Sequence, residues 1–136
     1  MKNLTTAIYS KLSGSALAAH VSNQLFKGRA PDATEYPYIV YMVVTDVPEK
    51  TFSEDFENVI VQFSLFSATS GTTELEDMYT DLKTLYDDQE LTVVGSTMIW
   101  MKRDIAVFSV EDHETPSGQQ RVFSYHVDYN IKMSLD

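Results

Sequence analysis

The strongest constraint on the fold is a strict alternation of apolar and polar side chains near the C-terminus. From Arg121 to Met133, every second residue is apolar or aromatic, and the residues between are mostly polar or charged. Alternate residues of a strand point to opposite faces of a sheet, so the pattern predicts a long strand with one face in a core. Since that face must pack against another layer, we expect a sheet covered on one side.

Two helices are predicted to form the covering layer. The first spans about Leu4 to Leu12, where apolar residues recur at helical spacing before Gly14. The second spans about Thr73 to Asp88 and carries an apolar stripe of Leu75, Met78, Tyr79, Leu82, Leu85 and Tyr86. Thr73 and Glu76 have the spacing of a capping box, which would start this second helix.

The remaining elements are predicted strands joined by loops or turns. The clearest are 38–45, apolar on both faces, then 59–66 and 98–110; shorter strands are expected at 24–27 and 92–94. Residues 46–58 contain Pro48 and are predicted to form either an exposed loop or an extended hairpin tip between two strands, and 113–120 a turn. Hairpin connections favour antiparallel pairing. The prediction is an α+β fold: an antiparallel β-sheet of about four main strands with two helices packed on one face.

Composition excludes several classes of protein. A chain of 136 residues is predicted to form a single domain. Its net charge of −10 disfavours a face that binds a nucleic-acid backbone, and the absence of cysteine excludes disulfides, thiolate metal sites and a cysteine nucleophile. The N-terminal segment has no long apolar run, so neither a signal peptide nor a membrane partner is expected.

Catalytic, metal and cofactor sites are not predicted. The histidines His20, His113 and His126 lie far apart in the sequence, without the spacing of a metal site. Gly71 is a lone glycine before a predicted helix and lacks the glycine-rich pattern that cradles phosphates. Lys102-Arg103-Asp104 interrupts an otherwise apolar strand, which indicates either a bulge at a sheet edge or a subunit boundary where charges pair.

Several stretches together resemble one known family. They are the opening helix, Gly28-Arg29-Ala30-Pro31 followed by Pro37-Tyr38-Ile39-Val40-Tyr41, the strand Val59 to Phe63 leading into the second helix, and the closing strand ending in YHVDYNIKM. In order and spacing, the chain resembles the tail-terminator, or tail-completion, proteins of long-tailed, siphovirus-like bacteriophages. The resemblance covers nearly the whole chain, and G-x-A-P…P-Y-I-V-Y is its motif.

The resemblance implies a structural virion protein without catalytic residues. Such a subunit would form a six-membered ring that caps the tail tube, ends its polymerisation and joins it to the head connector. The implied partners are further copies of the chain, the tail tube protein and a head connector or neck protein. DNA would pass through the bore only as cargo. The protein would lie at the neck end of the virion tail, after assembly in the host cytoplasm.

A ring of this kind needs two different complementary patches on each subunit. The predicted ring-interface residues come from the first long strand and from the charged interruption: Tyr38, Val40, Met42, Val44, Lys102, Arg103 and Asp104. The loop expected to reach the tube or line the bore supplies Glu49, Lys50, Glu54, Asp55 and Glu57.

Two other classes of function remain open from the sequence. An acidic DNA mimic or protein-binding module would carry carboxylates spaced like phosphates along one face. A small enzyme would need a pocket that shifts the pKa of a titratable group. Of these three hypotheses, only the tail-terminator function requires the protein to self-associate.

Overall fold

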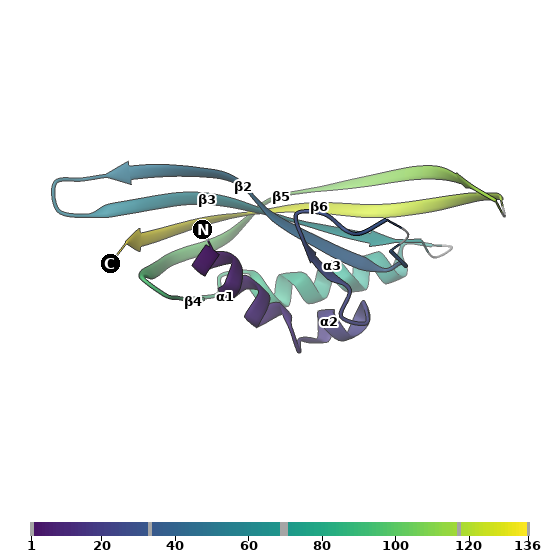
Figure 1. The fold of residues 1–136 in the computed structure, drawn as a ribbon, viewed down its shortest axis with the longest axis horizontal. Coiled ribbons are helices and arrows are strands. Elements are labelled where there is room, and N and C mark those ends of the chain that lie inside the picture. The colour runs from purple at the N-terminus through teal and green to yellow at the C-terminus, as the bar shows by residue number, and fades with distance from the viewer. Residues whose placement is uncertain (1, 33, 69–70, 117, 136) are drawn as a thin grey trace.

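A computed structural model describes residues 2–32, 34–68, 71–116 and 118–135. Within them, three helices lie on one side of a six-stranded sheet of order β1-β2-β3-β6-β5-β4 (Figure 1). The elements are α1 (Lys2–Leu12), α2 (Ala16–His20), β1 (Leu25–Lys27), β2 (Tyr38–Lys50), β3 (Asp55–Ser67), α3 (Thr73–Tyr86), β4 (Thr92–Val93), β5 (Ser96–Thr115) and β6 (Gly118–Leu135).

The predicted fold class of four antiparallel strands and two helices is wrong. The sheet is mixed, because β1 pairs in parallel with β2, with Leu25 opposite Ile39. A parallel pair cannot be closed by a hairpin, and residues 28–37 provide the longer connection between the two strands. The additional helix, α2, has five residues and is capped by Ser15, whose hydroxyl accepts a hydrogen bond from the Ala18 N–H at 3.1 Å.

The strands are longer than predicted: of the two alternatives for 46–58, the extended hairpin tip is confirmed and the exposed loop is wrong for most of its length. β2 continues to Lys50 and β3 starts at Asp55, leaving 51–54 as the connection. Likewise, β5 continues to Thr115 and β6 starts at Gly118, within the predicted turn. Because the sheet twists strongly, the β2–β3 and β5–β6 hairpins project as arms in opposite directions (Figure 1).

The core lies between the helices and one face of the sheet. The apolar face predicted for the last strand is confirmed, with Val127, Tyr129 and Ile131 fully buried. In α3, Leu82 is fully buried, as the predicted stripe requires. The expected capping box is wrong, because Thr73 is the first residue of α3 and the N-cap is Thr72, which makes no side-chain capping hydrogen bond.

Two core tyrosines join the helices to the sheet. The Tyr86 hydroxyl donates to the backbone oxygen of Ile8 at 2.8 Å, and its ring stacks on Phe63 with centroids 4.8 Å apart. The Tyr129 hydroxyl donates to Asp87 at 2.6 Å. Burial raises the pKa of both tyrosines well above the usual value, and the Asp87 hydrogen bond adds to the shift at Tyr129.

We expect the free energy of unfolding to fall as pH rises above about 10. Below that pH both states keep the two tyrosines neutral, whereas above it the unfolded chain releases phenolic protons that the folded chain retains. Denaturant unfolding between pH 8 and pH 11.5 measures the slope. Tyr86→Phe should flatten the slope, because it removes a tyrosine whose pKa burial raises. Equal slopes in wild type and Tyr86→Phe would contradict this expectation.

Candidate interaction surfaces

The predicted tube or bore residues lie on the β2–β3 arm. Glu49 is in β2, where its carboxylate accepts a hydrogen bond from Asn58 Nδ2 at 2.9 Å and lies 3.4 Å from Lys132 Nζ. These contacts hold the pKa of Glu49 below its usual value. The other predicted residues are exposed or half-buried: Lys50, Glu54, Asp55 and Glu57. Phe52, which the sequence reasoning missed, is fully exposed at the tip. We call residues 46–58 the acidic arm.

The predicted interface residues of β2 differ in exposure. Tyr38 is half-buried and stacks on Phe66 with ring centroids 4.8 Å apart. Val40 is buried, Met42 is half-buried and Val44 is 50% exposed. Of these four side chains, Val44 is therefore the best placed to contact another molecule.

The charged interruption lies across the sheet from these residues, in β5. The pairing register shifts between Arg103 and Ile105, so the predicted bulge is confirmed. Arg103 Nη1 donates to the Tyr79 hydroxyl at 2.8 Å, and Arg103 Nη2 lies 3.4 Å from the Asp87 carboxylate. These contacts tie Arg103 to α3 and its C-terminal end, whereas Lys102 and Asp104 are exposed on the sheet.

The sequence does not reveal that four apolar side chains of β5 are between 44% and 52% exposed. Ile105 and Val107 lie on the face that carries Asp128 and His126, whereas Phe108 and Val110 lie on the helix-bearing face beside Tyr125 and Phe123. An apolar run of this kind suggests a buried strand, and the sequence does not show that the short strand predicted at 92–94, which is β4, is its outer neighbour. The exposure of these side chains therefore follows from the position of β5 in the sheet order.

The sheet ends in two short strands, β1 and β4, which cover only part of the neighbouring long strands β2 and β5. β1 pairs with β2 at residues 39–41, and the Gly28 N–H bonds to the Tyr41 oxygen at 2.8 Å. On the other side, β4 pairs with β5 at 96–97, and the Asp88 N–H bonds to the Met101 oxygen at 3.1 Å. Beyond these contacts no other described strand lies alongside. We call residues 42–50 the β2 edge and residues 102–113 the β5 edge.

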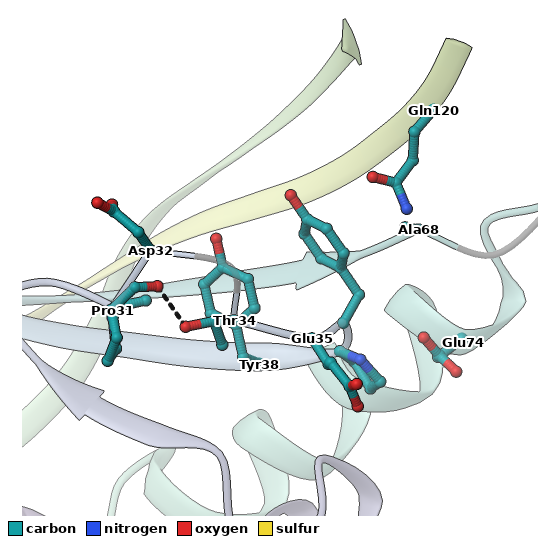
Figure 2. A pocket seen from close by; sticks show the side chains of 11 residues that line it. Pro31, Asp32, Thr34, Glu35, Tyr38, Ala68, Glu74 and Gln120 are labelled. Carbon is teal, nitrogen blue, oxygen red and sulfur yellow. Dashed lines mark hydrogen bonds between the residues drawn. The ribbon is translucent and has the colours of Figure 1, made fainter. Parts of the chain in front are cut away.

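A cavity of about 720 Å³ lies at the start of β2, where the segment after β1 returns to the sheet (Figure 2). The G-x-A-P…P-Y-I-V-Y motif forms part of its wall through Ala30, Pro31, Pro37 and Tyr38. Two of its carboxylates have partners within the chain: Asp32 pairs with Arg29 at 3.2 Å, and Glu74 accepts from the Ser67 hydroxyl at 2.7 Å. Four residues of the motif thus line one cavity beside the start of β2.

The described residues do not form a catalytic or metal site. Ser64 Oγ lies 2.8 Å from His126 Nδ1, but the nearby Asp128 accepts a hydrogen bond from Gln62 at 3.0 Å and has no contact with the imidazole. In the part of the chain that the structure covers, three or more potential metal ligands do not gather anywhere. Nor does any helix there have the length and apolarity to span a membrane.

Comparison with known proteins identifies the family. The model of the family described as "Tail completion protein gp17" matches residues 6–133. A chain from a structure described as "Virion of native gene transfer agent (GTA) particle" has the same fold, with a TM-score of 0.66 at 11% identity over 95% of this chain and 94% of that chain. No curated protein matches. The chain therefore belongs to the gp17 family of tail completion proteins, and it is a structural component of a bacteriophage particle rather than an enzyme.

Proposed function

We propose that the whole chain acts as one tail-terminator domain that forms a ring of six copies at the neck end of the tail. The ring caps the tail tube, ends its polymerisation and joins it to the head connector. Subunits are made in the host cytoplasm, and DNA passes through the bore as cargo. The observation that carries the ring is the presence of two different open strand edges on opposite sides of one sheet.

Open edges of this kind favour assembly. An uncovered strand presents unpaired backbone groups, and proteins that stay monomeric usually shield such edges with charges, prolines or bulges. The β5 edge has a bulge and charges near Lys102, but its outer part exposes apolar side chains. Because the two edges differ, contact between them is heterologous, and such contacts close into rings when the rotation between copies allows.

Complementation of a phage that lacks this protein tests the function. Without the cap, tail tubes should grow past their normal length and heads should lack attached tails. Supplying the wild-type protein should restore both tube length and joining. If the phage that lacks the protein makes unattached tubes of normal length, the protein does not end polymerisation. If that phage makes overlong tubes that are joined to heads, the protein does not join tail and head.

The acidic arm is proposed to face the tube or the bore. Its carboxylates would then keep DNA from adhering as it passes, since like charges repel over a screening length of about 8 Å at physiological salt. The chain as a whole carries a net charge of −10, so the bore would have few cations to hold DNA.

We expect the triple variant Glu49→Ser, Glu54→Ser, Asp55→Ser to fold normally and to impair the virus. The three side chains are exposed, so thermal unfolding should change little. Tailed and infectious particles are then counted after complementation. Normal tails with slowed DNA release would indicate the bore, and tailless heads would indicate a joint. A wild-type titre with normal tails and normal DNA release would contradict the proposal.

A further inference from the structure

We propose that neighbouring copies join by pairing the β2 edge of one copy with the β5 edge of the next, which makes the sheets of the ring one closed β-barrel. This inference rests on the proposed ring and adds the surface through which a second copy binds. Four observations support it: the strand directions, the covering of each edge, the side chains along the edges and the room inside the resulting barrel.

The strand directions allow the sheet to continue from one copy to the next. β2 is antiparallel to β3, β3 to β6, and β6 to β5, so β2 and β5 run in opposite directions within one copy. When the β5 edge of a neighbour is placed beside β2, the two strands are again antiparallel. The joint therefore repeats the pairing found inside the subunit and leaves no long edge uncovered.

The covering of the edges determines how the copies are offset. Through the register of β3 and β6, Met42 lies level with Ile105, and Thr45 lies level with Lys102. Without an offset, the neighbour's β5 beyond Ile105 would collide with β1, which covers β2 as far as Tyr41. Sliding the neighbour toward the tip of the acidic arm removes this collision and brings more of the two edges together. Barrels require such a stagger between strands in order to close.

The side chains along the two edges are complementary in this staggered arrangement. The offset moves Lys102 from the level of Thr45 past Asp46 toward Glu49, which places a cation beside carboxylates. It also moves Val107 toward Val44. Both valines are about half-exposed in the single copy, at 48% and 50%, so the joint would remove apolar surface from water at both edges.

The barrel would be wide enough to hold a channel. Strands lie about 4.8 Å apart and tilt by roughly 40°, so four long strands from each of six copies would give a backbone diameter of roughly 45 to 50 Å. Barrels with fewer strands, such as porins of 16 to 18, already hold an aqueous channel. The helices lie on one side of the sheet (Figure 1). The opposite face, which carries the pairs Ser64–His126 and Gln62–Asp128, would line the bore.

Disulfide cross-linking tests the pairing directly, because the chain has no cysteine of its own. Three double variants combine Val44→Cys with Ile105→Cys, Val107→Cys or Ser109→Cys. Within one copy β2 and β5 are three strand spacings apart, roughly 14 Å, whereas a disulfide requires Cα atoms within about 7 Å. Any disulfide between these sites must therefore join two copies. The matched control combines Val44→Cys with Tyr9→Cys, at an exposed position of α1 that belongs to neither edge.

Assembled protein is oxidised mildly and run on a denaturing gel without reductant. We expect at least one of the three pairs to convert the monomer band into a ladder that ends at six copies, and reduction to restore the monomer band. The pair that links best reports the offset. The control should remain monomeric. Rings visible by electron microscopy with no link from any pair would overturn this inference and leave the proposed function intact. An absence of both rings and links would overturn both.

Discussion

Leu82→Asp is expected to unfold the subunit rather than only to weaken its assembly. Leu82 is fully buried in the middle of α3, where the helix packs on the sheet. An unpaired charge at such a site costs roughly 3 to 5 kcal/mol, and the lost leucine contacts add to this. The stability of a domain of this size is only about 5 to 15 kcal/mol. Circular dichroism and thermal unfolding of the purified variant measure the effect.

The control is Thr84→Asp, two residues further along the same helix at an exposed position. It introduces the same charge without burying it, so its unfolding curve should stay close to that of the wild type. A folded Leu82→Asp protein that fails to assemble would show that this face of α3 packs on a partner instead of on the sheet.

The double variant Ile105→Glu, Val107→Glu is expected to fold but to lose assembly. Both side chains are about half-exposed, so the single copy loses little when they become charged. In the ring, the same changes remove apolar contact and place two charges in each joint. A loss of about 3 kcal/mol per joint weakens association roughly a hundredfold. Sedimentation of the purified variant and the titre after complementation measure the effect.

Tyr9→Glu serves as its control, because Tyr9 is an exposed aromatic residue on α1 and belongs to neither edge. This control should assemble and complement as the wild type does. If the double variant assembles normally, the β5 edge is not a ring contact. If the double variant is unfolded, Ile105 and Val107 contribute to the stability of the single copy, contrary to their exposure.

The sequence predicts the periodic elements of this fold well. The alternation around Val127 and Tyr129 and the helical stripe around Leu82 each report a face in contact with a core, and the structure confirms both. The mixed sheet could not be predicted, because the parallel partner of β1 depends on how residues 28–37 fold back. The length of the arms was missed because Pro48 and a run of acidic residues suggest a loop, whereas the pairing of Pro48 with Glu57 continues the ladder.

The candidate surfaces follow the same division. Charges inside an apolar strand are unusual, so the residues at 102–104 indicate an irregularity in the strand, and the bulge there is confirmed. The apolar side chains of β5 gave no such signal, since a buried strand and an exposed edge strand can have the same composition. Their exposure depends on β4 covering only residues 96–97 of β5, which is a property of the folded sheet.

Imaging of the protein alone at high concentration and at the ends of isolated tails tests whether the subunits form a ring. We expect a closed six-fold ring with an open centre, at the neck end of each complete tail. Averaged end views measure the symmetry and the bore. Particles that remain monomeric in solution, together with tail ends that carry no ring, would contradict the account.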